Sequence, residues 1–317
     1  MINKITKVIL GAVLAVFGAV GLMSFSASAA ETPSGYIQIS PVLERISIAP
    51  GEVYTGTFHV NNIGSDTFKY KLKASRYSVT GDDYTPNYSN KTAYNKLAEW
   101  VEFDREGGEL APGGSDEIAY TITVPTDVPA GGQYAALIAE IDNSKNKTET
   151  DKGQTSIQTV AQVALLVYAK ISGNTREEGT IKSNDISGFL TEGPITATSV
   201  VENTGNVDVE AKYIFKVFPF FSGEEVYTNE DNPTVRTILP ETTRFNTESW
   251  NEAPGFGIFN VEQTVDFLGK SENKTVKRLV IICPFWLIIV IALFILTVVF
   301  WIVSRVVSRK KKAGATK

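Results

Sequence analysis

The sequence contains very little cysteine and histidine, with one residue of each among 317. The cysteine, Cys283, falls in a long apolar run, so the rest of the chain must hold together by core packing without disulfides. The histidine, His59, cannot by itself make a zinc site, which needs three or four ligands. No nucleophile and acid are arranged with it as a catalytic triad requires, and no glycine-rich phosphate loop is present. We therefore expect no cofactor, no metal and no enzyme, although carboxylate-only chemistry stays open because acidic pairs follow no spacing rule.

Apolar runs of membrane length are also scarce, and the chain has two. The first, residues 8–25, follows Lys4 and Lys7 and precedes the small residues 26–30. That order predicts a signal peptide over residues 1–30, cleaved after Ala29 or Ala30, with an uncleaved N-terminal anchor as the alternative. No cysteine lies near this cleavage site, which excludes a lipoprotein anchor.

The second apolar run, residues 279–303, contains no charge. At about 1.5 Å per helical residue it would span roughly 37 Å, enough to cross a hydrocarbon core of about 30 Å. Trp286 and Trp301 lie towards its two ends, and a basic tail over 304–317 follows it. We expect a single-pass plasma-membrane protein with extracellular N-terminal domains and a cytoplasmic C-terminus.

The charge distribution agrees with this topology. All 35 acidic residues and 22 of the 30 basic residues lie between the two apolar runs, so the exported part carries 22 − 35 = −13. A surface of this charge is a poor partner for nucleic acid or for an anionic membrane face.

Strict alternation of apolar and polar residues predicts antiparallel strands in the exported part. Residues 68–74, 118–124 and 259–267 each place apolar side chains on one face, and Pro-Gly, Gly-Gly and Asn-x-Gly signals separate such runs. Only residues 90–99 indicate any helix. Many short strands at this spacing predict an all-β fold of immunoglobulin-like β-sandwiches.

The order of these signals occurs twice. An Asn-x-Gly turn between two strands appears at Asn62 and again at Asn203, 141 positions later (203 − 62). The sequence thus predicts two tandem β-sandwich domains, over 31–172 and 173–278, with a boundary near Gly173. Gly64 and Gly205 are expected to occupy positive φ in these turns. The first domain carries an insertion over 77–99 and a polar loop over 143–155.

Three surfaces could bind a partner. The insertion and its flank combine aromatic rings with amides, a mixture that suits sugar rings: Tyr84, Tyr88, Tyr94, Trp100, Asn87 and Asn90. An apolar cluster that could meet a protein partner comprises Phe218, Phe220 and Phe221. Lys69, Lys71 and Lys73 share one strand face and could meet an anionic wall polymer. For each surface, packing within the domain or simple solvation is the competing interpretation.

A short segment, Leu239-Pro240-Glu241-Thr242-Thr243, resembles the sorting motif by which transpeptidases attach proteins to bacterial walls. Its fifth residue is threonine where that motif has glycine, and it lies 36 positions before the second apolar run (279 − 243). We therefore expect it to be an element of the second domain.

Ile39-Ser40-Pro41, then Ile48-Ala49-Pro50-Gly51 leading into a strand and an Asn-x-Gly turn, resemble the start of the WxL-interacting cell-surface proteins of Gram-positive bacteria. The layout of two domains, one membrane helix and a basic tail resembles that family over the whole chain. The resemblance implies peptidoglycan binding by the first domain and a protein partner for the second, and it assigns no binding residues. We expect a membrane-anchored binding module of the bacterial envelope that recognises a wall polymer or a surface protein. The alternative is a structural or assembly component of a membrane complex.

Overall fold

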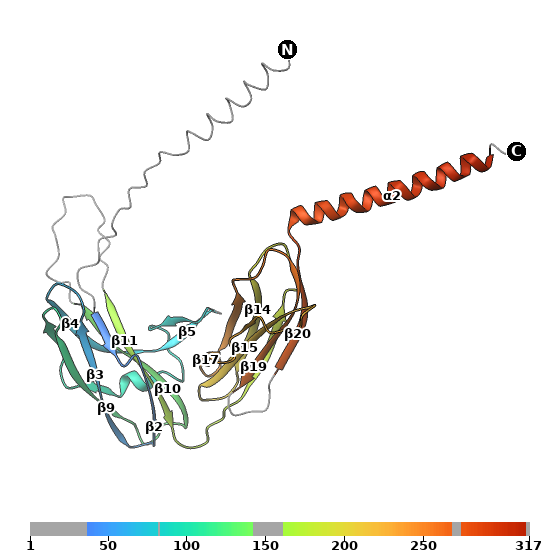
Figure 1. The fold of residues 1–317 in the computed structure, drawn as a ribbon. Coiled ribbons are helices and arrows are strands. Elements are labelled where there is room, and N and C mark those ends of the chain that lie inside the picture. Colours follow the sequence, from blue (N-terminus) through green and yellow to red (C-terminus); the bar gives the residue numbers. More distant parts are fainter. Residues whose placement is uncertain (1–36, 82, 142–160, 268–273, 315–317) are drawn as a thin grey trace, which may run out of the picture.

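The computed structural model describes residues 37–81, 83–141, 161–267 and 274–314. The predicted signal peptide, the polar loop over 143–155 and the side chains of the basic tail lie outside the described part. Most described residues form β-strands, and one helix, α2 (Phe285–Gly314), follows them. The prediction of a mainly β chain ending in an apolar helix is confirmed (Figure 1).

The first β-sheet unit contains two packed sheets. One has the order β1-β3-β9-β7 and the other β2-β11-β10-β4-β8, and the small hairpin β5-β6 stands apart from both. The bounds are β1 Ile37–Ser40, β2 Leu43–Ile48, β3 Val53–Asn62, β4 Phe68–Arg76, β5 Ser78–Thr80, β6 Thr85–Asn87, the 3₁₀ helix η1 Lys96–Glu99, β7 Val101–Phe103, β8 Gly107–Leu110, β9 Ser115–Thr123, β10 Gly131–Ile141 and β11 Gln162–Ile171. The helical signal at 90–99 thus reduces to the single turn η1.

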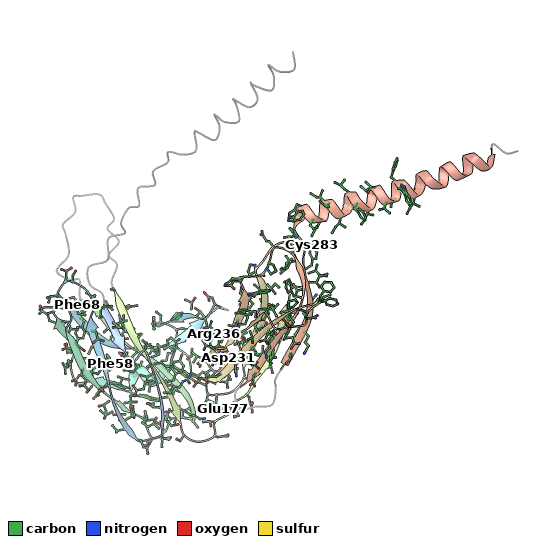
Figure 2. The ribbon with its side chains drawn as sticks, in the orientation of Figure 1. Phe58, Phe68, Glu177, Asp231, Arg236 and Cys283 are labelled. Atoms are coloured by element: carbon green, nitrogen blue, oxygen red, sulfur yellow. The ribbon has the colours of Figure 1, made fainter. Side chains whose placement is uncertain are left out.

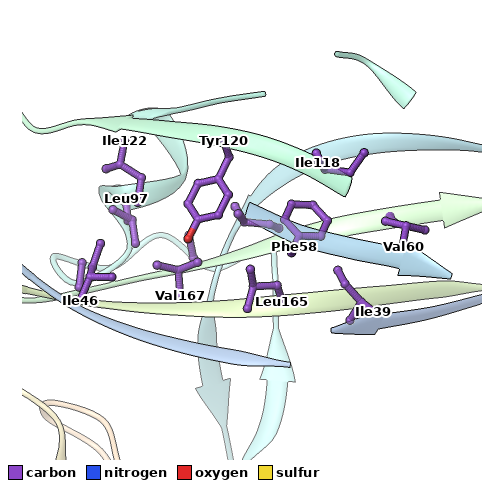
Figure 3. Close-up of a cluster of buried hydrophobic side chains, with 14 of the residues drawn as sticks. Ile39, Ile46, Phe58, Val60, Leu97, Ile118, Tyr120, Ile122, Leu165 and Val167 are labelled. Atoms are coloured by element: carbon purple, nitrogen blue, oxygen red, sulfur yellow. The ribbon is translucent and has the colours of Figure 1, made fainter. Parts of the chain in front are cut away.

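The core of the first unit lies between its two sheets. Phe58 and Tyr120 come from one sheet and Leu165 and Val167 from the other, and their side chains face one another (Figure 3). Tyr120 is one of the residues that the alternation in 118–124 places on the apolar face, because successive strand side chains point to opposite faces. His59, next to Phe58, is exposed.

The second β-sheet unit repeats this plan. Its sheets have the orders β12-β14-β18 and β13-β20-β19-β15-β16, with β17 also paired to β15. In both units the first strand (β1 or β12) belongs to one sheet. The second strand belongs to the other sheet and pairs in parallel with the last strand of the unit, β2 with β11 and β13 with β20. The bounds are β12 Gly179–Ile186, β13 Phe189–Leu190, β14 Ile195–Asn203, β15 Val209–Pro219, β16 Tyr227–Thr228, β17 Thr234–Ile238, β18 Thr243–Trp250, β19 Gly257–Phe267 and β20 Lys274–Ile282. The predicted boundary near Gly173 falls in the connection over 172–178.

The repeated turn has the same hydrogen bonds in both units. Asn62 Nδ2 donates to the carbonyl oxygens of Asp66 (2.8 Å) and Leu110 (2.9 Å), and its Oδ1 accepts from the Gly64 amide at 2.9 Å. Asn203 makes the corresponding three bonds, each of 2.8 Å, to Val207, Ile238 and Gly205. A buried asparagine therefore closes each turn and satisfies backbone groups that would otherwise be unpaired.

The expected reason for the glycines in these turns is wrong. Neither Gly64 nor Gly205 is among the positive-φ glycines of the described residues. Gly205 is needed for close approach, since a Cβ there would lie 2.2 Å from the carbonyl oxygen of Arg176 in the connection between the units.

The helix α2 begins six residues later than the apolar run suggested (285 − 279). Leu279 to Ile282 instead complete β20, where Val280 and Ile282 are buried in the core of the second unit. The sequence does not show the boundary between β20 and α2, because a buried strand end and a membrane helix have the same apolar composition. Within the described residues one helix, over Phe285–Val303, is long and apolar enough to cross a membrane.

Candidate functional site

The predicted insertion packs against the second unit, and the hairpin β5-β6 reaches towards it (Figure 1). Tyr84, in the hairpin turn, has a φ of 64°. Its hydroxyl oxygen accepts a hydrogen bond from the Leu239 amide at 2.5 Å and lies 2.7 Å from the Thr242 hydroxyl. The guanidinium of Arg244 lies 4.2 Å from the centre of the Tyr84 ring, within range of a cation–π contact. Burial raises the pKa of Tyr84 and lowers the pKa of Arg244.

A second tyrosine of the insertion bonds across the same boundary. The Tyr94 hydroxyl donates to Glu241 Oε1 at 2.8 Å. Burial, together with this bond to a carboxylate, raises the pKa of Tyr94 to about 12. Glu241 has a φ of 56°, and with Tyr84 it is one of two non-glycine residues at positive φ in the described part of the chain. Such a conformation costs energy, so the surrounding contacts must hold it.

Arg45 of β2 forms a charged contact with the second unit. It makes ion pairs with Asp208 and, at 2.9 Å, with Glu210, and it donates to Thr237 Oγ1 at 2.8 Å. Burial alone would lower the pKa of Arg45, but the hydrogen bond and the charge of Asp208 raise it. Asp208 also meets Tyr134, whose hydroxyl donates to Asp208 Oδ1 at 3.1 Å and accepts from the Asp208 amide at 2.9 Å.

Asn206 completes the contact on the side of the connecting segment. Its carbonyl accepts from the Gly132 amide at 2.7 Å, and its Nδ2 donates to the Ala130 carbonyl at 3.2 Å. We call this region the interunit joint: Arg45, Tyr84, Tyr94, Gly132 and Tyr134 of the first unit with Asn206, Asp208, Glu210, Leu239, Glu241, Thr242 and Arg244 of the second. The segment that resembles a sorting motif is thus part of the joint.

A cavity of about 230 Å³ opens at the interunit joint. Tyr77, Tyr94 and Tyr134 contribute rings, whereas Asn90, Thr92 and Glu241 contribute polar groups. Asn90 and Glu241 are exposed, while Tyr77 and Tyr134 are buried, so the cavity has an aromatic floor and a polar rim.

The predicted site residues therefore separate into two groups. Asn90 and Tyr94 line the cavity. The others support the fold: Tyr84 is in the joint, Tyr88 packs on Tyr77 with ring centres 6.2 Å apart, Trp100 packs on the first core, and Asn87 Oδ1 accepts from the amides of Ser89 and Asn90. No sequence signal pointed to Glu241 as a partner of Tyr94, because the two are 147 positions apart.

On the lysine face of β4, lysine side chains form ion pairs with glutamates of neighbouring strands. Lys69 lies 3.4 Å from Glu109, and Lys73 makes an ion pair with Glu140. Lys69, Lys71 and Lys73 are all exposed. Neighbouring glutamates partly neutralise this face, which favours the solvated interpretation over a polymer-binding one.

The predicted apolar cluster lies at the end of the second unit from which α2 leaves. Phe218 is half-buried, whereas Phe220 and Phe221 are 51% and 87% exposed, with ring centres 5.3 Å apart. Beside them is a shallow hollow of about 340 Å³ lined by Phe218, Gly223, Asn260, Glu262, Lys277, Arg278 and Leu279. Cys283 lies at the base of α2, next to the end of β20 (Figure 2).

Sequence reasoning missed a buried polar belt in the second unit. Gln263 is buried between Val261 and Val265 on the inward face of β19 and donates to Ser199 Oγ at 3.0 Å. Glu248, also buried, accepts from Asn229 at 3.0 Å and from Asn246 at 2.8 Å. The polar inward positions of β18 were the available signal. Because slipping a strand would break these buried bonds, we interpret the belt as fixing register.

Nothing in the described residues resembles a metal centre. No group of three or more histidine, cysteine, aspartate or glutamate side chains is placed to hold a metal ion in that part of the chain. The expectation of a non-catalytic protein stays a prediction.

Comparison with known proteins gives only distant structural likeness. No family model matches the chain, and no curated protein matches it. Among solved structures, the chain is similar to the YadV chaperone, with 11% identity, 76% of this chain and 98% of the other covered, and a TM-score of 0.37. It is also similar to the CsuC–CsuE chaperone–tip subunit complex of Csu pili from Acinetobacter baumannii (10%, 77% and 98%, 0.36) and to the E. coli chaperone DraB (10%, 77% and 98%, 0.33). These values describe remote similarity of fold.

Proposed function

We propose that this protein is a membrane-anchored, non-catalytic recognition protein of the bacterial cell envelope. Two immunoglobulin-like sandwiches form its extracellular part, α2 spans the plasma membrane, and the basic tail is cytoplasmic. The proposal includes membership of the WxL-interacting surface proteins. A wall polymer, or a surface protein, is bound at the cavity of the interunit joint.

The observation that carries the proposal is the convergence of both units on this cavity. Asn90 and Tyr94 come from the insertion, and Glu241 comes from the turn between β17 and β18. Aromatic rings beside an amide and a carboxylate offer a stacking face and hydrogen-bonding groups, which is the mixture that sugar rings and peptide side chains need. Sites between domains are common places for such recognition.

The volume of the cavity limits the size of the ligand group that can enter it. About 230 Å³ is below the roughly 300–1,000 Å³ of pockets that enclose whole small molecules. The cavity therefore suits one sugar residue or one side chain of a longer molecule that continues outside it. Both a polymer and a protein partner meet this condition.

The structural or assembly role is the second candidate, and the joint also favours it. Tyr84, Arg45 and Asn206 fix the second unit against the first through bonds that need no ligand. A rigid two-unit spacer would use the same contacts.

Retention of the full-length protein, purified in detergent, on purified peptidoglycan tests the proposal. Asn90→Ala should weaken retention without loss of fold, because Asn90 lines the cavity and its hydrogen bonds to Asn87 and Asn95 use its backbone groups, which alanine keeps. Asn251→Ala, an exposed asparagine of the second unit outside the cavity, is the matched control.

Equal retention of wild type and Asn90→Ala would remove the joint cavity as the polymer site. If wild type is not retained at all, the proposal of a wall-polymer ligand is refuted. Photo-crosslinking from position 90 in intact cells then tests for a protein partner. Absence of any crosslink would leave the structural role. Protease added to protoplasts tests the topology separately, since it should digest both units and spare the tail.

A further inference from the structure

The second unit is tied closely to the membrane helix. β20 ends at Ile282 and α2 begins at Phe285, so only Cys283 and Pro284 connect them. Three steps of about 3.8 Å between successive Cα atoms allow at most roughly 11 Å between these two residues. The Cys283 amide donates to the Leu190 carbonyl at 2.8 Å, and the Leu287 amide donates to the Pro284 carbonyl at 2.9 Å, which fixes both ends of the connection.

The strand register shows which segments share this end of the unit. Ile282 lies opposite Gly257 of β19 and beside Leu190 of β13. Pro219, the last residue of β15, pairs with Phe259, and the Phe220 amide donates to the Ile258 carbonyl at 2.9 Å. The segments 189–190, 218–221, 256–258 and 279–282 therefore meet where α2 leaves the sheet.

Exposed phenylalanines concentrate at this end. Outside α2, five phenylalanines whose side chains the structure describes are exposed, and four of them lie in these segments: Phe189 (57%), Phe220 (51%), Phe221 (87%) and Phe256 (64%). The fifth, Phe245, lies within β18. We name the four residues the aromatic rim. A soluble surface rarely exposes such a group, and a clustered one marks an interaction site.

The connection to α2 decides what covers the aromatic rim. If α2 spans a bilayer, a connection of two residues holds the end of the sheet at the headgroup layer, leaving little room for a protein beneath it. Phenylalanine rings can be buried at that depth, as they are on the apolar faces of helices that lie at the boundary between headgroups and acyl chains. Lys277 and Arg278 are exposed on β20, five and four residues before its end (282 − 277 and 282 − 278), and Glu262 pairs with Lys277 at 2.5 Å.

Carboxylates also face this region. Glu192, Glu224 and Glu252 are exposed on loops adjoining the segments that carry the aromatic rim. With charges of both signs present, contact with lipid must depend on the rings, and anionic lipid should not be required.

We propose that the aromatic rim inserts into the outer interfacial layer of the bilayer that α2 spans, seating the second unit on the membrane at a fixed orientation. This inference rests on the proposed function, because it requires α2 to be a membrane anchor. The occupant of the surface is lipid, and its recognition is apolar.

The experiment uses the full-length chain in vesicles of zwitterionic phosphatidylcholine. Cys283, the only cysteine, is replaced by serine, and a single cysteine carries an environment-sensitive fluorophore at one of three places. Phe221→Cys probes the aromatic rim, Phe245→Cys is the matched exposed phenylalanine, and Leu293→Cys reports on α2. Nitroxide groups on lipid headgroups or on the upper acyl chain act as quenchers for positions 221 and 245, and nitroxide groups near the end of the acyl chain act as quenchers for position 293.

The emission at position 221 should shift to shorter wavelength and be quenched several-fold more strongly than at position 245. Water-like emission at 221 with strong quenching at 293 would overturn the inference and leave the anchor intact. Absence of quenching at 293 would instead refute the anchor, and the inference with it. A shift at 221 that appears only at high protein-to-lipid ratio would assign the rim to self-association and overturn lipid contact.

A second variant gives an independent reading. Phe221→Ser should reduce quenching of a fluorophore at Phe256→Cys, because loss of the most exposed ring of the aromatic rim should weaken the insertion of that whole end of the unit. Phe245→Ser should not change it. Equal quenching in both variants would contradict a shared insertion.

Discussion

Replacement of Asn203 by alanine tests whether the repeated turn stabilises each unit separately. The Asn203 side chain is buried and makes three hydrogen bonds of 2.8 Å, to the backbone of Val207, Ile238 and Gly205. At about 0.5–1.5 kcal/mol for each bond, the loss should be roughly 3 kcal/mol, and unsatisfied buried backbone groups would add to it. For a domain of about 100 residues this corresponds to a fall of roughly 12–24 °C in the melting temperature.

Hydrogen exchange measured by mass spectrometry on the full-length protein resolves the two units. Asn203→Ala should lower amide protection in β15 and β19 of the second unit and leave β4 and β10 of the first unit nearly unchanged. Asn62→Ala, which breaks the same three bonds in the first unit, should give the opposite pattern. Asn251→Ala is the control for an exposed amide.

A loss of less than about 0.5 kcal/mol for Asn203→Ala would refute the reasoning, since it would show that the three bonds contribute less than one typical buried bond. Equal loss of protection in both units from either variant would refute the separation of the units.

Three further changes probe the joint and the second turn. Tyr84→Phe leaves the buried Leu239 amide without its acceptor, so amide exchange at 239 should speed up by the equivalent of about 1–3 kcal/mol, and an unchanged rate would contradict the bond. The pKa of Tyr94 is about 12 in the folded protein against 10 for a free tyrosine, so its contribution to the joint is complete below pH 10 and is lost as the pH rises through 12. Tyr94→Phe should therefore show a smaller loss of interunit contact between pH 10 and 12, measured by energy transfer between labels on the two units, and superimposed curves would refute it. Gly205→Ala places a Cβ 2.2 Å from the Arg176 carbonyl and should lower the stability of the second unit, which normal thermal unfolding would disprove.

Much of the fold followed from local pattern. The alternation in 68–74 and 118–124 placed Phe68, Tyr70, Leu72, Ala74, Ile118, Tyr120, Ile122 and Val124 on apolar faces. The structure buries six of the eight, and Leu72 and Ala74 are half-buried against the same core. Local alternation suffices there because the side-chain period of a strand is set by its own backbone. The doubled Asn-x-Gly signal predicted two similar turns, and their hydrogen bonds match.

Local pattern failed where strand and helix share a composition. Leu279 to Ile282 are as apolar as α2, and only pairing with β19 shows that they end a sheet. Gly205 was expected for its backbone conformation, yet a neighbouring carbonyl from another segment is what excludes a side chain.

The candidate site depended on tertiary structure. Tyr84, Tyr94 and Asn90 belong to one polar and aromatic segment of the sequence. Their different roles in the structure depend on residues about 150 positions away. The Leu239 amide and Glu241 bind the two tyrosines, and Asn90 remains at the rim of the cavity. The sequence by itself determined the strands, the repeat and the apolar helix, because each arises from contacts along a short stretch of chain. Which loop joins the units and which rings stay exposed was decided by the packing of distant segments, for which no local periodicity exists.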